Sequence, residues 1–553
     1  MKNFKPLSLA AAVAAASVGY VGVASAQVTG PLGIAAETGL GDAAIIPYYT
    51  VQAGFSTGLS VINTSSETQV VKIRLRRAAD SMDALDFNVV LSPEDVWTGY
   101  VQMEESAVGP ILGLPEIRFY TNDKSCTIPE NNGWLTMPEI YRVGAEEGYI
   151  ELIGMGAADA LQPISRDALH AQSGPTLGIP RDCTRVSDNF RRGVNAQDYY
   201  PDYASWDAGS TRTRGVINST LTAQHRVVNG VVTTSPESSV YTDTGNVLKV
   251  SYFIKDDDSG IEFGNDAEHI ENFMDGASIT NQTVGVFEGD LQGFDHPDLN
   301  GGAPASTGGL IANIPAVVPN AGIRGSYEGV RLALGGATLI NDWSDNDQGA
   351  FTVDTDWVVT TPGQYLMTNL FGYLSSLADE TVICGPGTPG VDNWQDDPNL
   401  PNYGANCDFR DIPMLATATV YDREERGITV EEDELVVSPQ PPGVIQENVL
   451  DQEVNVITFG ASVLESAKQI AVPKPDGATA GWATLSVTPN AGKTQAICSF
   501  TSQPGITADD LEVTCASVVN SAAPLIGFVA WQRNFDANPD ANYGRIVRHS
   551  RSN

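Results

Sequence analysis

The chain has 553 residues and carries 68 acidic against 31 basic residues, which gives a formal net charge of −37. A chain this acidic repels phosphate backbones, so its composition argues against nucleic acid as a partner. Its length predicts several domains that can each bury a sizeable core.

The N-terminus has the pattern of a secretory signal peptide. Two lysines precede an apolar, alanine-rich run over residues 7–23, and the tripeptide Ala24-Ser25-Ala26 follows it. A basic start, an apolar stretch and a small-x-small cleavage site are typical of an exported precursor. The alternative, a membrane anchor, fits less well because the run is short and polar sequence follows it. We therefore predict a signal peptide over residues 1–26. The mature protein is then extracellular, on the cell surface or in the periplasm, with no membrane-spanning segment.

Residues 57–101 predict short β-strands separated by turns. Apolar and basic side chains alternate along residues 71–76, and apolar and polar ones alternate along residues 85–91. A period of two places one row of each strand on a core and the other row in solvent. The breaks between these segments are rich in Ser, Asn, Asp and Pro, which favour turns. These features predict an N-terminal β-sandwich of the immunoglobulin-like kind over residues 27–115.

The basic row of this predicted sheet consists of Lys72, Arg74 and Arg76, and Arg77 extends it. Like charges on one face repel one another, so something must offset them. One interpretation is that Asp86 on the neighbouring strand does so. The other is that the row lies in solvent and docks on an acidic face of another copy of the protein, or on anionic cell-surface polysaccharide.

The remaining sequence predicts further β-structure joined by long Gly- and Asp-rich loops. Residues 116–240 are irregular and suggest a disulfide-clipped region with a few short helices. Residues 241–438 predict a central β-rich domain, and residues 444–553 predict a C-terminal β domain. Between them, residues 431–443 run from acids into prolines and are typical of a linker. The predicted fold class is mainly β, a multi-domain β-sandwich architecture.

The chain contains six cysteines, and an even count in an exported protein predicts disulfides. None of them lies in a C-x-x-C pair, which argues against zinc-ribbon and thioredoxin-type sites. Sequential pairing is the simplest connectivity because each pair then falls within one local segment. The predicted bonds are Cys126–Cys183, Cys384–Cys407 and Cys498–Cys515.

No match to a catalytic motif lies in the structural context that the motif requires. Residues 54–58 match G-x-S-x-G, but a nucleophile elbow needs a helix after the serine and a strand-like segment follows here, which favours a turn. The five histidines show no metal-ligand spacing. The aromatic run over residues 199–206 could stack on sugars, although packing in a loop under a disulfide is favoured. The sequence therefore assigns no catalytic or cofactor-binding residue, and a non-enzymatic role is favoured.

Several acidic loops have the closely spaced oxygen donors that Ca²⁺ prefers. The preferred one lies at residues 341–347, with Asp345 and Asp347 as predicted ligands, because Asn346 and Gly349 permit a tight turn around an ion. None of the loops has the glycine position of an EF-hand. The alternative interpretation is that these loops are solvated turns.

Several phrases spread over most of the chain are distinctive. They are GDAAIIPYYTV, GLSVINTS, LDFNVVLSPEDVWTGYV, INDWSDND, TDWVVTTP, YDREER, EVNVITFG, GFVAWQRNF and YGRIVRH. Together they resemble a family of exported cell-surface, surface-layer-like proteins of Gram-negative bacteria. The resemblance implies a surface location and an assembly role, and it brings no catalytic motif to particular positions.

Two hypotheses about function follow. The first is an exported structural or binding protein at the bacterial cell surface that can self-assemble. The second is a secreted hydrolase that acts on polysaccharide through carboxylates in its loops, which would require a pocket that holds two carboxylates.

Overall fold

The structure is a computed structural model. It describes residues 34–79, 81, 83–129, 133–188, 215–218, 226–228, 231–233, 241–257, 259–274, 278–281, 297, 299, 330, 333–363, 414–430, 436–438, 450, 452–489, 497–501, 512–516, 523–535 and 537–552. The predicted signal peptide, Cys384, Cys407 and the aromatic run at residues 199–206 lie outside these ranges. The described residues are mainly β-strand with short helices, which confirms the predicted fold class.

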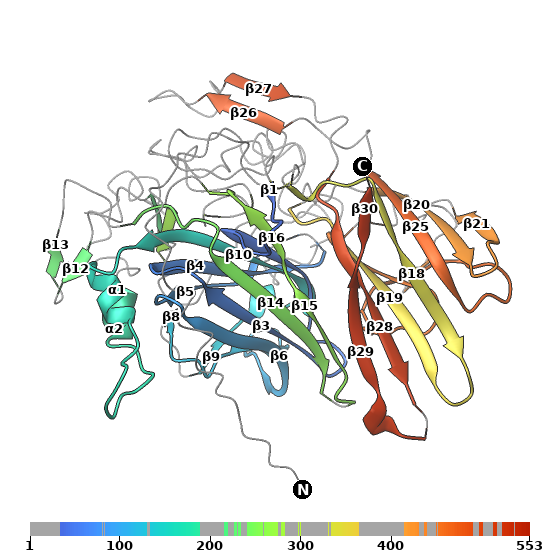
Figure 1. The fold of residues 1–553 in the computed structure, drawn as a ribbon, viewed down its shortest axis with the longest axis horizontal. Coiled ribbons are helices and arrows are strands. Elements are labelled where there is room, and N and C mark those ends of the chain that lie inside the picture. Colours follow the sequence, from blue (N-terminus) through green and yellow to red (C-terminus); the bar gives the residue numbers. More distant parts are fainter. Residues whose placement is uncertain are drawn as a thin grey trace, which may run out of the picture. The chain divides into compact units, whose positions relative to one another are not determined.

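The N-terminal half of the described chain forms two large sheets, here called sheet A and sheet B, and two small two-stranded sheets. In spatial order, the strands of sheet A are β1 (Ile34–Ala35), β16 (Glu268–Glu271), β2 (Ala43–Thr50), β10 (Glu147–Ala158), β4 (Thr68–Arg77), β5 (Asp83–Leu91) and β8 (Cys126–Ile128). Those of sheet B are β15 (Glu262–Asp266), β14 (Leu248–Asp256), β3 (Phe55–Asn63), β6 (Val96–Val108), β7 (Pro115–Tyr120) and β9 (Trp134–Thr136). Figure 1 shows that strands distant in sequence, such as β3 and β14, lie side by side.

Sheets A and B pack face to face around an aromatic core. The ring of Phe87 on β5 lies 4.9 Å from that of Phe119 on β7 and 5.8 Å from that of Trp97 on β6, measured between centroids. All three side chains are fully buried. Because aromatic side chains bury a large apolar area, this cluster accounts for much of the cohesion between the sheets. The two sheets form a β-sandwich, and it includes the strands predicted within residues 57–101.

The basic row of β4 is buried, so the prediction that it lies in solvent is wrong. Lys72, Arg74 and Arg76 are only 1–2% exposed. Lys72 Nζ lies 3.3 Å from Asp86 Oδ2, and Arg74 Nε lies 3.1 Å from Asp86 Oδ1. On the other side of β4, Arg76 Nε lies 2.8 Å from Glu151 Oε1 on β10. The interpretation that Asp86 offsets the row is confirmed, and docking through this row is ruled out by its burial. The alternation of residues identified two faces of the strand but not whether the second face was covered.

A disulfide-linked segment covers one end of the outer face of sheet A. It contains two short helices, α1 (Pro163–Ala168) and α2 (Cys183–Asp188), and the bond Cys126–Cys183 ties α2 to β8. Val186 of α2 belongs to a buried cluster with Val70 and Val90 of the sheet. The other short elements of this half are η2 (Glu139–Tyr141), β11 (Gly215–Asn218), β12 (Arg226–Val228), β13 (Val231–Thr233) and β17 (Ser278–Asn281).

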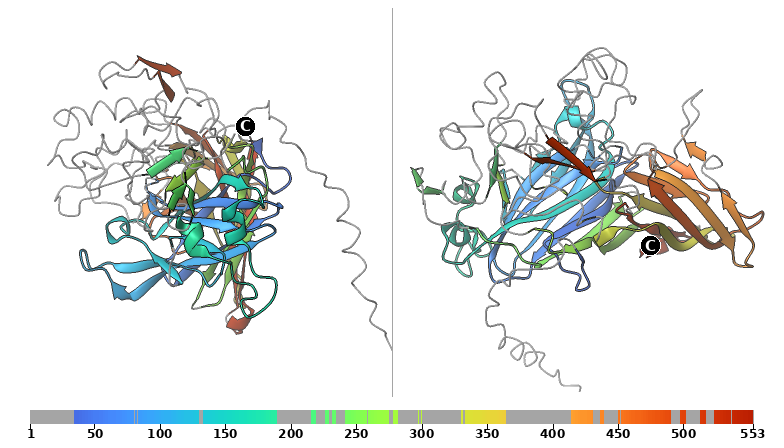
Figure 2. Two further views of the ribbon diagram at one scale, coloured as in Figure 1. Left: turned by 90° about the vertical axis from the view of Figure 1, so that its left-hand side faces the viewer. Right: turned by 90° about the horizontal axis from the view of Figure 1, so that it is seen from above.

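The C-terminal half contributes an 11-stranded sheet among the described residues. Its strands are β18 (Thr338–Asp347), β19 (Thr352–Thr360), β20 (Met414–Asp422), β21 (Gly427–Val430), β22 (Val436–Ser438), β23 (Val454–Thr458), β24 (Gln469–Ala471), β25 (Ala480–Pro489), β28 (Ile526–Asn534), β29 (Tyr543–Arg548) and β30 (Ser550–Ser552). A separate hairpin consists of β26 (Ile497–Thr501) and β27 (Glu512–Ala516), and η8 (Pro539–Ala541) precedes β29. Strands coloured yellow and red in Figure 2, such as β19 and β28, pair directly although about 170 residues separate them.

Strand β18 joins the two halves of this sheet. Its residues 338–344 pair with β25, whereas residues 345–347 pair with β19. The two halves meet in a core where Phe459 stacks on Trp343 of β18 and contacts Trp357 of β19, with ring centroids 5.4 and 5.5 Å apart. The indole nitrogen of Trp357 also donates a hydrogen bond to Asp342 O, at 2.8 Å. A strand shared in this way is a common means of closing a sheet into a sandwich.

The sheets do not follow the predicted domain boundaries. Strands β14 to β16 belong to the predicted central domain at 241–438, yet they complete sheets A and B. Strands β18 to β21 of the same segment pair with strands of the predicted C-terminal domain. Strand β22 lies inside the predicted linker at 431–443. Residues 32–553 form one compact unit by their contacts.

His269 of β16 is buried as a hydrogen-bond acceptor, which predicts sensitivity to acid. Its Nε2 accepts the backbone N–H of Val250 at 2.8 Å, which requires the neutral ring, and burial lowers the pKa of His269 to about 4. The charges nearest to the ring are those of Lys249, Asp266 and Arg548. Because this pKa lies below the unfolded value near 6.5, the contribution of His269 to stability is complete above pH 6.5 and is lost as the pH falls towards 4.

We therefore expect wild-type protein to lose about 3 kcal/mol relative to His269→Gln between pH 6.5 and 4. The measurement is denaturant unfolding of both proteins across that pH range. The comparison with the variant is needed because burial also raises the pKa of Asp42 and of Asp356 to about 7. Protonation of these two acids stabilises the folded state as the pH falls through the same range, which opposes the effect of His269. The prediction would be contradicted if the free energies of unfolding of the two proteins changed in parallel with pH.

Candidate functional site

The outer face of sheet B carries a row of aromatic side chains that are in register across six strands. The register runs from Gly264 to Phe253, Gly58, Tyr100, Tyr120 and Trp134. We call these residues the aromatic row. Their neighbours along each strand, such as Val101 and Phe119, point to the core instead. Since strands lie about 4.8 Å apart, the row is about 24 Å long.

The rings of the aromatic row form a nearly continuous apolar strip at one end. Tyr100 and Tyr120 are stacked with centroids 5.3 Å apart and planes 18° apart, and Trp134 follows at 6.2 Å. Trp134 is 42% exposed, and the other three rings are half-buried. Arg118 lies over the indole of Trp134, with its guanidinium carbon 5.1 Å from the ring centroid. Cross-strand contacts between aromatic rings stabilise such an arrangement in the absence of a ligand.

Glycine at position 58 makes room for the other end of the row. The ring of Phe253 occupies the space that a Cβ atom at Gly58 would need. The outer edge of the Phe253 ring therefore reaches over β3, and Phe253 and Tyr100 both line a groove of about 490 Å³. Hydroxyl side chains line this groove beside the rings, namely Ser60, Thr98 and Ser251. The groove thus combines flat apolar walls with small hydrogen-bonding groups, which is the composition of a ligand site.

Polar contacts on the flank fix the orientation of Tyr120. Its hydroxyl donates a hydrogen bond to Glu104 Oε1 at 2.7 Å, and this bond lowers the pKa of Glu104. Arg118 Nε donates to Glu116 Oε2, also at 2.7 Å. These hydrogen bonds fix the side chains of the row before a ligand binds. Little side-chain entropy is therefore lost on binding.

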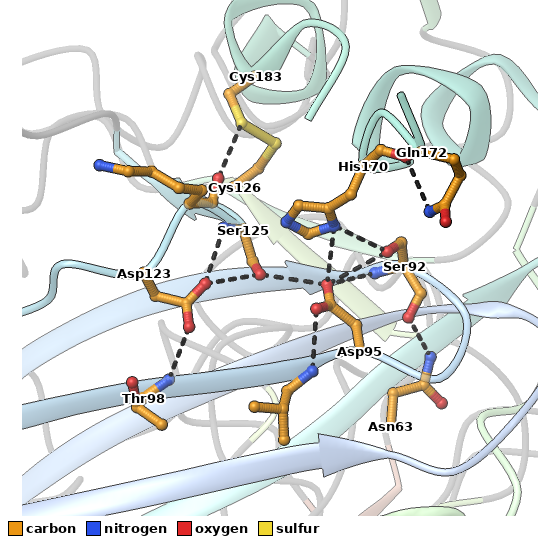
Figure 3. Close-up of polar contacts among 12 residues, drawn as sticks. Asn63, Ser92, Asp95, Thr98, Asp123, Ser125, Cys126, His170, Gln172 and Cys183 are labelled. Carbon is orange, nitrogen blue, oxygen red and sulfur yellow. Dashed lines mark hydrogen bonds and ion pairs between the residues drawn. A yellow bond between two sulfur atoms is a disulfide. The ribbon is translucent and has the colours of Figure 1, made fainter. Parts of the chain in front are cut away.

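A second polar cluster lies beside the disulfide and brings Ser92, Asp95 and His170 together (Figure 3). Ser92 Oγ lies 3.2 Å from His170 Nδ1, and Asp95 Oδ2 lies 3.6 Å from the same nitrogen. In a catalytic triad the serine and the acid contact opposite nitrogens of the imidazole. This cluster therefore lacks triad geometry. Ser125 also donates to Asp95, at 3.1 Å, so the cluster ties the segments around β8 and α1 to the β5–β6 turn.

The G-x-S-x-G match at residues 54–58 is not a nucleophile elbow. Gly54 has a φ of 83° and ends a turn, and Ser56 is already a buried residue of β3. A strand follows the serine where an elbow needs a helix.

The predicted calcium ligands, Asp345 and Asp347, have other partners in the structure. Asp345 and Asp347 lie in the extended strand β18, so the prediction of an acidic loop at residues 341–347 is wrong. The carboxylate of Asp345 is paired with the ammonium group of Lys474, and Asp347 Oδ1 accepts the backbone N–H of Gly349 at 2.7 Å. In the part of the chain that the structure describes, no three His, Cys, Asp or Glu side chains lie together as metal ligands. A site with a bound ammonium group does not fit Ca²⁺.

One of the three predicted disulfides is confirmed and two remain predictions. Cys126 and Cys183 are bonded. Cys498 and Cys515 lie directly opposite each other in the backbone register of β26 and β27, which is the arrangement that the prediction requires. Cys384 and Cys407 are outside the described ranges.

The chain has no match among protein-family models or among curated protein sequences. Among the described residues, no helix has the length and apolar character needed to cross a membrane. The aromatic row is therefore the strongest functional feature on which to base a proposal.

Proposed function

We propose that this is an exported protein that binds a neutral polysaccharide at the cell surface, and that the aromatic row holds the polysaccharide chain. The observation that carries the proposal is the register of four aromatic rings and two glycines across sheet B. A sugar ring has a flat face of C–H groups that packs on an aromatic ring, and its hydroxyl groups accept and donate hydrogen bonds. The side chains of Ser60, Thr98 and Ser251 supply the matching polar groups.

The length of the row favours a chain of sugars over a single ring. From Phe253 to Trp134 the rings span four strand spacings, or about 19 Å, which is several times the length of one sugar unit. They follow a line across the strands rather than surrounding a point. The row therefore supports contacts with successive units of an extended polymer.

The charges around the row favour an uncharged polysaccharide. Glu104, Glu116 and Glu262 flank it together with the cations Arg118 and Lys255. Glu116 is already paired with Arg118. This balance leaves no surplus of positive charge to attract an anionic polymer. The cell-surface location rests on the signal peptide predicted at residues 1–26 and on the family resemblance.

The test is affinity gel electrophoresis of the purified protein against soluble polysaccharides, with neutral glucans, xylan and galactomannan compared with alginate. We expect at least one neutral polymer to retard the wild-type protein. Tyr120→Ala and Trp134→Ala should each weaken that binding about tenfold, since a central aromatic contact is worth more than about 1 kcal/mol. Both side chains are on the solvent face, so folding should be retained.

The matched control is Val96→Ala. Val96 is exposed on the same strand as Tyr100 but lies outside the row, so its loss should leave binding unchanged. Equal binding by wild type and both aromatic variants, or binding of alginate alone, would contradict the proposal. Release of new reducing ends from a bound polymer would instead favour the hydrolase hypothesis.

A further inference from the structure

A second cavity, of about 710 Å³, lies at one end of the C-terminal sheet. Two tryptophans, Trp482 and Trp531, line it together with Asp342 and Arg545. These four residues come from the strands β25, β28, β18 and β29. Sites carried by strands hold their side chains in a fixed geometry.

The indole of Trp482 is a supported, exposed platform. One face stacks on Tyr421 at a centroid distance of 4.4 Å, with the planes 12° apart. Tyr421 in turn lies close against Gly427, where a Cβ atom would come within 2.6 Å of the tyrosine ring. Trp482 nevertheless remains 43% exposed, so the face opposite Tyr421 is open to the cavity.

A hydrogen-bond acceptor lies directly beside this platform. Asp342 of β18 is the register partner of Trp482, so the two side chains share one face of neighbouring strands. The Asp342 side chain is 47% exposed and lines the cavity, so a ligand can reach its carboxylate. A carboxylate accepts hydrogen bonds from hydroxyl groups, and such bonds to a charged acceptor are stronger than neutral ones.

A hydrogen-bond donor lies next to the acceptor. Arg545 Nη2 is 4.0 Å from Asp342 Oδ2. The guanidinium of Arg545 lies over Trp531, with its central carbon 4.3 Å from the ring centroid, and its side chain is 51% exposed. Stacking on the indole restricts the guanidinium plane, and the half-exposed side chain can still donate hydrogen bonds to a ligand in the cavity.

We propose that this cavity is a second, separate binding site, and that its ligand is a single neutral pyranose with two adjacent hydroxyl groups. The C–H face of the sugar stacks on Trp482, one hydroxyl donates to the carboxylate of Asp342, and its neighbour accepts from Arg545. A hydroxyl group can do both, which is why a carboxylate beside a guanidinium matches a pair of hydroxyls. The cavity is lined by equal numbers of acidic and arginine side chains, which favours an uncharged ligand. They are Asp342, Asp422, Glu425, Arg423, Arg533 and Arg545.

The experiment is saturation-transfer NMR with the full-length mature protein and the methyl glycosides of glucose, galactose, mannose and N-acetylglucosamine. At least one glycoside should bind saturably in the millimolar range. Trp482→Ala should abolish the signal. Asp342→Ala should weaken binding about tenfold or more, since a hydrogen bond to a charged group is lost. Circular dichroism of each variant checks that it is folded.

The control is Trp134→Ala, which removes a tryptophan of nearly the same exposure, 42% against 43%, from the aromatic row. It should leave glycoside binding at the cavity unchanged, whereas Trp482→Ala should leave polysaccharide binding at the row intact. The proposal for the aromatic row and the proposal for the cavity can therefore be refuted independently of each other. The inference is overturned if no glycoside binds the wild type, or if folded Trp482→Ala and Asp342→Ala proteins bind as the wild type does.

Discussion

Replacing Asp86 with alanine should lower the free energy of unfolding by about 3–5 kcal/mol. Asp86 is fully buried and contacts both Lys72 and Arg74, at 3.3 and 3.1 Å. Its removal leaves two buried cations without their shared carboxylate. The desolvation of those cations was offset by the ion pairs in the native state, and it is no longer offset in the variant. Chemical denaturation of the purified variant gives the change directly.

The matched control for Asp86→Ala is Asp257→Ala. Asp257 also forms an ion pair, with Lys255 at 2.5 Å, but both side chains are at least 40% exposed. An exposed pair contributes little, so this variant should stay within about 1 kcal/mol of the wild type. Equal effects of the two substitutions would show that the buried row of β4 does not depend on Asp86.

Removal of the Cys126–Cys183 disulfide should cost about 4 kcal/mol. The bond closes a loop with a sequence separation of 57 residues, and the chain-entropy model gives this order of stabilisation for such a loop. The bond also ties α2 to β8, so its loss releases Val186 from the buried cluster that it forms with Val70 and Val90. The double variant Cys126→Ser with Cys183→Ser tests this by denaturant unfolding.

The double variant is preferable to a reducing agent, because a reductant would also open the other predicted disulfides. Peptide mapping under non-reducing conditions should show that bonds elsewhere are unchanged. A free energy of unfolding within about 1 kcal/mol of the wild type would mean that the segment of α1 and α2 is held by packing alone.

Local patterns were sufficient to predict the strands of the first sandwich but not the environment of each face. The alternation over residues 71–76 correctly separated Val71, Ile73 and Leu75 from the basic row. It could not show that Glu151, some 75 residues further along the chain, would lie beside Arg76. The sequence does contain one signal, since Glu151 lies inside the apolar segment of β10. A buried acid requires a partner, so this position indicated that a buried cation lies nearby. The position of the partner depends on tertiary structure.

The candidate site could not be predicted because it exists only in the register between strands. Tyr100, Tyr120 and Trp134 each occupy an ordinary outward position of a short strand. Phe253 is more than 100 residues further along, and its place beside Gly58 follows from the pairing of β14 with β3. The prediction of an acidic loop at residues 341–347 was wrong for a different reason. Closely spaced acids resemble a loop in composition, but these residues lie in β18, and the carboxylate of Asp345 is paired with Lys474.

Hydroxyl-radical footprinting with and without the bound polysaccharide tests the role of the aromatic row most directly. The polysaccharide that retards the wild-type protein most strongly is used, and oxidation is read at each aromatic residue by mass spectrometry. We expect protection of Tyr100, Tyr120, Trp134 and Phe253, while Tyr543, which is 41% exposed in the C-terminal half, is oxidised as before. Unchanged oxidation of the row in protein that is demonstrably bound would contradict its assignment as the binding surface.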